Sequence, residues 1–343
     1  MTNRAMTNRA GREAIKLASL KEGGRDGTLV VVSADLQRCA RVPGIAATMQ
    51  AALESWATAS GKLAQAYTQL NAGRLAGAEP FAPENAASPL PRAYQFIDGS
   101  AYVHHAQRVH QSRGLTMPDF YWTEPLMYQC GSDGFMGPTD PMLAADESWG
   151  LDFEAEVAVI TDAVPMGVSA EAALDHIALV MLLNDFSLRN LIVAEKAKGV
   201  GFLNCKPTSS FTPVAATPAV LGAAWDGRKL HRPLVTSLNG KPFGRPECGE
   251  DMTFDFGVLV AHAAKTRALG PGTIIGSGPV SNHDHSRGCS AIAEQRLFEK
   301  IEHGEPTTPF MRFGDRVRVE MFDADGRSIF GAIDQPAARY EGP

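Results

Sequence analysis

The sequence contains no long apolar run, no block of like charge and no cysteine spacing typical of a zinc site. Without about 18 consecutive apolar residues or a charged-then-apolar leader, we expect neither a transmembrane helix nor a signal peptide. The net charge of −6 is spread along the chain, which argues against nucleic acid or an anionic membrane as a partner. Free thiols in a reducing cytoplasm are expected for the five scattered cysteines, Cys39, Cys130, Cys205, Cys248 and Cys289.

Nucleotide-binding motifs are also missing. Gly276-Ser-Gly278 follows an expected strand but opens no helix, so we expect no nucleotide cradle there. The composition is that of a globular protein, and 343 residues allow one large or two unequal domains. Met-Thr-Asn-Arg-Ala occurs twice at the start. We interpret residues 1–12 as a start-site artefact, expected to be disordered, that takes no part in the fold.

Residues 13–90 are expected to form a small N-terminal domain and its linker. Residues 15–20 and 28–32 flank Gly-Gly and Asp-Gly turn signals, which is typical of a β-hairpin. Apolar residues then recur at helical spacing over 45–76, which predicts one or two helices. The Pro- and Ala-rich segment 77–92 is expected to connect the two domains.

Residues 91–338 are expected to form a larger, strand-rich domain. Its clearest helix is predicted over 169–183, where Ser169 can cap the first turn and apolar residues form a stripe. Another helix is predicted over 253–266. Many short strands with few helices predict an α+β protein with mixed or antiparallel sheets. The predicted strands include 273–276, 316–321 and 328–331.

The segment 151–160 has strand-forming character and carries Glu154 and Glu156 two residues apart. On a strand, these two side chains point to the same face. Like charges so close repel each other unless a cation lies between them. Oxygen ligands suit a hard divalent cation such as Mg²⁺, Ca²⁺ or Mn²⁺. Taken alone, however, so short a pattern is explained more simply by a solvated acidic face.

Other candidate residues are ordinary when each is considered alone. Asp98 is typical of a turn, and Asp185 of the exposed end of the helix predicted before it. His105 is expected in a loop, where histidine more often lies at the surface, although its pKa suits acid–base chemistry. Lys206 lies in an uncharged stretch, where it could reach water or meet an anion. These patterns alone do not join the residues into one site.

Five short motifs nevertheless occur together along residues 94–335: Phe96-Ile-Asp-Gly-Ser-Ala-Tyr-Val-His-His105, Asp152-Phe-Glu-Ala-Glu156, Leu183-Asn-Asp-Phe-Ser-Leu-Arg189, Gly276-Ser-Gly-Pro-Val-Ser-Asn282 and Gly288-Cys-Ser-Ala-Ile-Ala-Glu294. In sequence and order they resemble the fumarylacetoacetate hydrolase family. The preceding residues resemble the small N-terminal domain of its longer members. The resemblance implies a mixed β-roll or β-sandwich core, commonly dimeric, with the small α+β domain packed beside it.

The resemblance also implies a metal site and a catalytic site. The divalent metal, Mg²⁺ first and Mn²⁺ or Ca²⁺ as alternatives, would be held by Asp98, Glu154, Glu156 and Asp185. The catalytic residues would be His105 as general base, Glu294 as the carboxylate that orients it, and Lys206 and Arg189 as cations near the developing oxyanion. Substrate-facing hydroxyls are implied for Ser100, Tyr128, Ser209 and Ser210.

Three positions depart from the family pattern. Pro279 replaces a threonine whose hydroxyl would hold a substrate carboxylate. Asn190 replaces an acid, and Ile192 stands where the hydrolases place a glutamine near the oxyanion. Because one missing oxyanion donor can lower a rate by about 10²–10³, these changes bear on the substrate and on the reaction, and they leave the metal ligands intact.

Three functions therefore stay open. The first is hydrolysis of a carbon–carbon bond in a β-diketo acid, such as an acylpyruvate, in aromatic-compound catabolism. In that reaction, the metal would chelate two substrate oxygens and His105 would activate water. The second is isomerisation or decarboxylation of a 2-oxo or 2-hydroxy-dienoic diacid at the same metal. The third is an inactive, metal-stabilised scaffold. The expected partners are a small oxo-acid substrate and a second copy of the chain.

Overall fold

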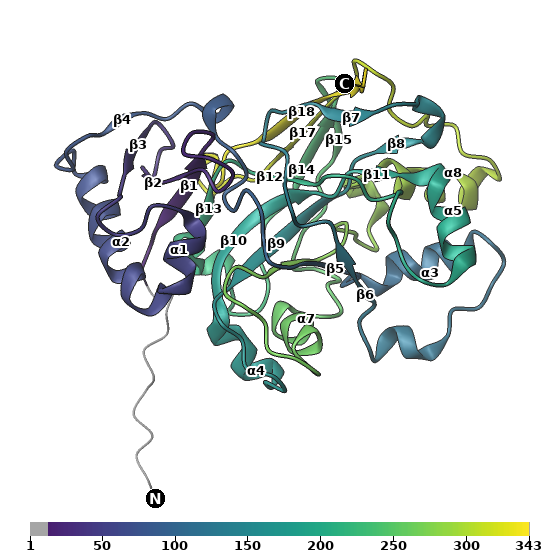
Figure 1. Ribbon diagram of the computed structural model, residues 1–343. Coiled ribbons are helices and arrows are strands. Elements are labelled where there is room, and N and C mark those ends of the chain that lie inside the picture. Colours follow the sequence, from purple (N-terminus) through teal and green to yellow (C-terminus); the bar gives the residue numbers. More distant parts are fainter. Residues whose placement is uncertain (1–12, 343) are drawn as a thin grey trace, which may run out of the picture.

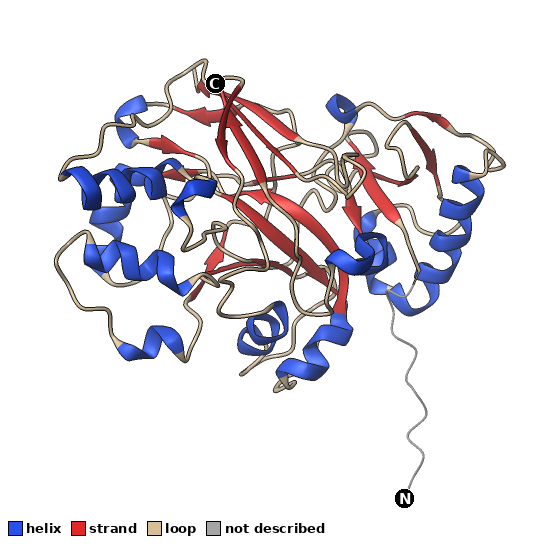
Figure 2. Ribbon diagram, turned by 180° about the vertical axis from the view of Figure 1, so that it is seen from behind, coloured by secondary structure: helices blue, strands red, loops and turns tan. Residues whose placement is uncertain are grey.

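The computed structural model describes residues 13–342, so the expectation for residues 1–12 lies outside the described residues. The chain forms one large mixed sheet, a second sheet of five strands and a two-stranded ribbon, with helices around them (Figure 1 and Figure 2). This confirms the α+β class expected from the sequence. None of the described helices is long and apolar enough to cross a membrane.

The N-terminal unit, which comprises strands β1 to β4 and helices α1 and α2, contributes four strands at one end of the large sheet. The predicted hairpin is confirmed as β1 and β2, with Leu17 opposite Val31. The predicted helices are confirmed as α1 (Met49–Glu54) and α2 (Trp56–Asn71). Part of the segment predicted as a connection, 77–92, is itself a strand that pairs with β3. The four strands are β1 (Lys16–Leu20), β2 (Thr28–Val32), β3 (Arg38–Arg41) and β4 (Glu79–Pro80).

The two parts of the chain share this sheet. Its order is β4-β3-β2-β1-β13-β10-β9-β16-β5-β6, with β12 also paired to β10. Strand β1 pairs antiparallel with β13 (Ala215–Ala216) from the larger part. Trp56 and Leu63 of α2 lie in the same apolar core as Met181 of β10. The N-terminal unit (left in Figure 1) therefore continues the sheet that carries the candidate site.

The centre of the sheet corrects one sequence prediction. The helix predicted over 169–183 is only one turn, α4 (Ala170–Ala173), followed by the 3-10 turn Leu174–His176 and then by strand β10 (Ile177–Asn184). Every residue of β10 is buried, so its sequence is apolar without alternation. Such a run fits a buried strand as well as a buried helix. The neighbouring strands are β9 (Ala155–Thr161), β16 (Ile274–Gly276), β5 (Phe96–Gly99), β6 (Met127–Cys130) and β12 (Ser210–Phe211).

The five-stranded sheet has the order β15-β14-β17-β18-β7. The strand predicted over 316–321 is confirmed as β17, but the one predicted over 328–331 is wrong. Ser328 makes only an isolated bridge to Phe322, and the chain becomes a strand at Ile333. The strands are β7 (Met142–Ala144), β14 (Val235–Leu238), β15 (Lys241–Gly244), β17 (Arg316–Glu320) and β18 (Ile333–Arg339), and the ribbon is β8 (Leu151–Asp152) with β11 (Ser187–Leu188).

Three helices gather at the end of the molecule opposite the N-terminal unit (right in Figure 1). They are α3 (Val103–Gln111), α5 (Arg189–Lys198) and α8 (Ile292–His303). The helix predicted over 253–266 is the shorter α7 (Phe256–Ala263), capped by Asp255. The remaining short elements are α6 (Pro218–Leu221) and the 3-10 turns Pro83–Asn85, Asp119–Trp122, Glu147–Trp149, Gly222–Ala224 and His285–Arg287.

Candidate metal centre and active site

Four buried carboxylates meet where the central strands end. Asp98, Glu154, Glu156 and Asp185 each place one oxygen within 4.8 Å of the others. Glu154 and Glu156 project side by side, although Glu154 lies just before β9 and not inside it. Asp98 lies on β5 and not in a turn, and Asp185 directly follows strand β10 and not a helix. Three strands therefore bring together all four residues that the family resemblance implied as metal ligands.

Two glycines allow the acids to approach. Gly276 of β16 lies opposite Asp98 on one side and Ala158 on the other. A Cβ at Gly276 would lie 2.5 Å from Asp98 Oδ1 and 3.0 Å from Glu156 Oε2, so a side chain there would push the two carboxylates apart. The backbone N–H of Gly278 donates to Asp98 Oδ1 at 3.1 Å and to Glu156 Oε2 at 2.9 Å.

Two cations neutralise one side of the cluster. Lys206 Nζ lies 2.5 Å from Glu154 Oε2 and 2.5 Å from Asp185 Oδ2. Arg189 Nη2 lies 2.6 Å from Glu154 Oε1. Burial raises the pKa of the Glu154 carboxyl, but Arg189 and Lys206 outweigh it and hold that pKa below its usual value. Glu154 is therefore ionised at neutral pH.

The other side of the cluster lacks this compensation. Burial and the neighbouring Asp185 raise the pKa of the Asp98 carboxyl. Burial, Asp98 and Asp185 raise the pKa of the Glu156 carboxyl well above its usual value. In the described part of the chain, Glu156 Oε1 is buried without a hydrogen-bond partner. An orphaned oxygen among converging carboxylates fits a hard divalent cation, which takes oxygen ligands.

A histidine–carboxylate pair lies near the acid cluster, since Ala291, three residues before Glu294, forms an isolated β-bridge with Glu154. His105 is on helix α3, not in the expected loop, and its Nδ1 lies 3.2 Å from Glu294 Oε1. Glu294 lies in the first turn of α8 with 1% of its surface exposed. This geometry can fix the imidazole in one tautomer and leave Nε2 as a proton acceptor.

Asp152 connects this pair to the acid cluster. Its Oδ1 accepts a hydrogen bond from the N–H of Ile292 at 2.8 Å, and its Oδ2 accepts one from Ala293 at 2.9 Å. Asp152 therefore holds the N-terminus of the helix that carries Glu294. Its Oδ2 also accepts a hydrogen bond from Arg189 Nε at 2.7 Å. Sequence reasoning missed Asp152 as a site residue, although its position two residues before Glu154 was a usable signal.

The predicted substrate-facing hydroxyls divide into two groups. Tyr128 donates to Asp185 Oδ2 at 2.9 Å, and Ser209 donates to Asp185 Oδ1 at 2.6 Å. Ser100 directly follows β5 and lies beside Gly278. Ser210 is buried elsewhere and donates to Gln335 at 2.6 Å. The structure thus brings three of the four to the cluster.

The positions that depart from the family pattern lie close by. Asn190 donates to the backbone carbonyl of Ser148 at 2.7 Å, so it tethers the 3-10 turn Glu147–Trp149. Ile192 is half-buried on α5, one turn after Arg189, and Pro279 is half-buried directly after Gly278. The side chains of Ile192 and Pro279 add no hydrogen-bond donor to the site.

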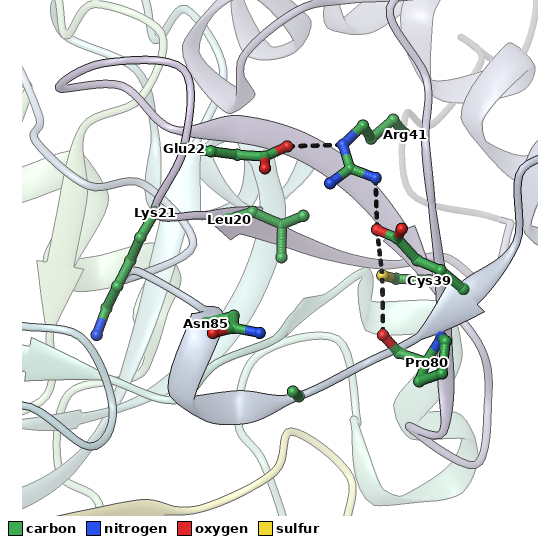
Figure 3. Close-up of a pocket in the computed structure, with 9 residues that line it drawn as sticks. Leu20, Lys21, Glu22, Cys39, Arg41, Pro80 and Asn85 are labelled. Carbon is green, nitrogen blue, oxygen red and sulfur yellow. Dashed lines mark hydrogen bonds and ion pairs between the residues drawn. The ribbon is translucent and has the colours of Figure 1, made fainter.

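A separate pocket of about 450 Å³ lies on the N-terminal unit (Figure 3). Arg41 crosses it between Glu22, at 2.6 Å, and Glu79, at 2.5 Å. Lys21 on its rim pairs with Asp140. The charges of this pocket are satisfied within the protein, and none of the predicted site residues lines it.

Comparison with known proteins matches the N-terminal part and the larger part of the chain to one family model each. The family model for the fumarylacetoacetate (FAA) hydrolase C-terminal domain matches residues 95–336. The model for fumarylacetoacetase N-terminal domain 2 matches residues 15–92. The first match covers most of the chain and includes the four carboxylates, both cations and the histidine pair.

The curated relatives that match the chain are named for different activities, a tautomerase and a hydrolase. The chain is 26% identical over 155 residues to "Oxaloacetate tautomerase fahd2, mitochondrial" of Xenopus laevis, covering 45% of this chain and 47% of that protein. It is 29% identical over 161 residues to a 2,4-didehydro-3-deoxy-L-rhamnonate hydrolase of Sphingomonas sp. (strain SKA58), covering 46% and 53%. The chain therefore spans about half the length of the curated relatives it matches.

A solved structure extends the likeness to the whole fold. The structure named as a probable 2-hydroxyhepta-2,4-diene-1,7-dioate isomerase from Mycobacterium abscessus aligns with a TM-score of 0.64. The alignment covers 96% of this chain and 99% of that chain, at 19% sequence identity. At this identity the likeness shows the fold alone.

Proposed function

Because the chain belongs to the fumarylacetoacetate hydrolase family, we propose that it hydrolyses a carbon–carbon bond in a β-diketo acid of the acylpyruvate class. The observation that supports this most strongly is the His105–Glu294 pair beside the acid cluster. An isomerase needs no activated water, whereas hydrolysis needs a base to make one. The pair provides this base.

We propose that Asp98, Glu154, Glu156 and Asp185 hold a divalent cation, with Mg²⁺ as the first candidate and Mn²⁺ or Ca²⁺ accepting the same oxygen donors. When bound, such an ion supplies Lewis-acid polarisation of the substrate oxygens. Tyr128 and Ser209 hold Asp185 from two sides and fix its orientation. Ser100, next to Gly278, is positioned to meet the substrate, whereas Ser210 supports the sheet through Gln335.

His105 takes the central proton-transfer role. With Nδ1 held by Glu294, its Nε2 removes a proton from water, and the water oxygen forms a bond to the distal carbonyl carbon. The bond between that carbon and the central methylene then breaks, and its electron pair passes to the pyruvyl fragment as an enolate. His105 returns the proton to the enolate carbon. Lys206 and Arg189 stabilise negative charge on the reacting oxygens.

The His105→Ala variant tests this function. We expect its rate on acylpyruvates to fall by about 10²–10⁴-fold, the contribution of a general base, while divalent-metal binding stays unchanged. A matched control is His110→Ala on the same helix, where the ring bonds the Ala106 carbonyl and packs edge-on against Tyr121. Full hydrolytic activity in His105→Ala would refute the assignment.

A second candidate is isomerisation or decarboxylation of a 2-oxo or 2-hydroxy-dienoic diacid. The observation that favours it is Ile192, an apolar residue on α5 one turn from Arg189, where a polar oxyanion donor would assist hydrolysis. A divalent cation held by the same acid cluster would stabilise an enolate without water attack. Product masses separate the reactions, because hydrolysis adds water, isomerisation leaves the mass unchanged and decarboxylation removes carbon dioxide.

We propose that the chain acts as a homodimer. The support is an apolar groove of about 650 Å³ lined by Leu143, Trp149, Leu191 and Tyr340, among others. Leu143 and Tyr340 are 44% and 52% exposed, which is high for large apolar side chains at a groove. Light scattering on the wild type and on Leu143→Asp tests this, with a dimer expected for the first and a monomer for the second. A monomeric wild type would contradict it.

A further inference from the structure

Helix α3 carries a buried arginine that none of the predicted roles uses. Arg108 lies one helical turn after His105, on the same side of the helix, with 9% of its surface exposed. A buried guanidinium is rare unless it is paired, because desolvating a charge is costly. Its contacts therefore indicate what it does.

Arg108 joins three segments around the catalytic pair. Its Nη1 donates to Glu294 Oε1 on α8 at 3.0 Å and to Ser281 Oγ at 2.9 Å. Its Nη2 donates to the carbonyl of Asn282 at 2.5 Å. The guanidinium also lies over the Phe298 ring, 4.4 Å from the centroid, which favours a cation. Two of its nitrogens are thus engaged by protein acceptors and are not free for a substrate.

One oxygen of Glu294 is shared between the arginine and the histidine. Glu294 Oε1 accepts from Arg108 Nη1, from the Ser281 hydroxyl and from His105 Nδ1. Burial raises the pKa of the Glu294 carboxyl, but His105, Ser281 and Arg108 together hold it below its usual value. A buried carboxylate whose only cationic partner was His105 would favour the imidazolium form and so oppose its use as a base.

We propose that Arg108 is a positioning residue for the catalytic pair: it balances the charge of Glu294, so that Glu294 orients His105 without holding a proton on it. This inference rests on the proposed role of His105 as general base. Arg108 acts through Glu294 and touches neither substrate nor metal ligands.

Other charged or titratable groups near the pair do not replace Arg108 in this role. The His104 ring bonds Ser281 Oγ at 3.1 Å, and burial, Arg108 and His283 lower the pKa of His104 to about 4, so it is neutral near pH 7. Burial keeps the Cys289 thiol protonated, with its pKa far above the usual value. The His283 ring lies tilted against the His104 ring, with their centroids 4.4 Å apart; its Nε2 lies 4.0 Å from Asp251 Oδ1, and the residue is exposed.

The test compares Arg108→Leu, Arg108→Lys and a control, His283→Gln, by pH profile and by NMR titration of His105. The His105 signal is assigned by its loss in His105→Gln. In Arg108→Leu we expect the titration midpoint of His105 and the acidic limb of kcat/KM to rise by about one pH unit, with KM unchanged. Arg108→Lys, which keeps the charge, and His283→Gln are expected to stay near the wild-type midpoint.

An unchanged His105 midpoint in a folded Arg108→Leu protein would overturn the inference, as would a raised KM with an unchanged acidic limb. The NMR titration needs no substrate. A His105 midpoint that shifts in Arg108→Leu would therefore support the role of Arg108 even if the wild type does not hydrolyse β-diketo acids. That second result would count against the proposed function alone. If the wild type hydrolyses β-diketo acids but the His105 midpoint does not shift in Arg108→Leu, the proposed function is supported and the role of Arg108 is refuted.

Discussion

The backbone N–H of Gly278 donates to one carboxylate oxygen of Glu156 at 2.9 Å, while the other oxygen of Glu156 has no partner among residues 13–342. The bonded oxygen is fixed by the protein, and Glu156 belongs to a buried cluster with three further carboxylates. A buried oxygen left without a donor costs about 1–3 kcal/mol. We infer that a bound cation removes that cost.

Glu154→Gln tests the metal ligands. Replacing one of the four proposed carboxylates by a neutral amide should weaken Mg²⁺ or Mn²⁺ binding by at least about tenfold, measured by titration calorimetry. Glu147→Gln is a suitable control, since Glu147 is acidic but contacts the N–H of Phe313 away from the cluster. Unchanged metal affinity in Glu154→Gln would mean that this side chain is not a ligand.

Lys206→Met should affect stability and metal binding in opposite directions. Without metal, loss of the ammonium leaves Glu154 and Asp185 less compensated, and the free energy of unfolding should fall by about 3–5 kcal/mol. Metal affinity should rise, because a competing cation is gone. Turnover should fall by about 10²-fold because an oxyanion donor is lost. Urea unfolding, calorimetry and kinetics measure the three effects, and weaker metal binding would contradict this reading.

Glu195→Gln should disturb the loop that presents Lys206. The Glu195 carboxylate accepts hydrogen bonds from the N–H groups of Leu203 and Asn204 at 3.0 and 2.7 Å. The Cys205 thiol and the backbone amides of this loop lower the pKa of Glu195 to about 2. Because the folded pKa lies below the unfolded one, the ionised carboxylate stabilises the fold above about pH 4.5, and this contribution fades as pH falls toward 2.

We therefore expect Glu195→Gln to be less stable than the wild type near pH 7 and the difference to shrink near pH 3. Urea unfolding at both pH values measures it. Turnover near pH 7 should also fall, by about tenfold, because Lys206 is held less firmly. A stability difference that grows on acidification would contradict the assignment.

Ile192→Gln tests the apolar departure on α5. If hydrolysis is the reaction and the missing donor limits its rate, the glutamine should raise kcat on an acylpyruvate, by up to about 10²-fold. Ile192→Leu, which adds no donor, serves as the matched control. A faster isomerisation without faster hydrolysis would favour the second candidate function.

The residues that sequence reasoning placed correctly follow local rules. Glu154 and Glu156 share a face because side chains alternate along an extended chain, even where β9 begins only at Ala155. The N-terminal hairpin and helices follow turn residues and helical spacing. The family resemblance, not the local pattern, singled out Asp98, Asp185 and Glu294, which come from segments far apart in the sequence.

The errors have a common physical cause. Residues 177–184 are buried on both faces of the sheet. Their sequence therefore lacks the alternation of polar and apolar residues that identifies a half-exposed strand, and a helix was predicted there instead. That error also placed Asp185 at a helix end. Arg108 was missed because α3 was not predicted, and without that helix nothing placed it one turn from His105. Its three acceptors come from two other segments, which only the folded chain brings together.

The most direct test of the proposed function is turnover of an acylpyruvate in oxygen-18 water with Mg²⁺, analysed by mass spectrometry. We expect two fragments, pyruvate and a carboxylic acid that carries one oxygen-18 atom, and formation of both about 10²–10⁴-fold more slowly by His105→Ala. A single product of unchanged mass, or loss of carbon dioxide without a labelled acid, would contradict hydrolysis at this site.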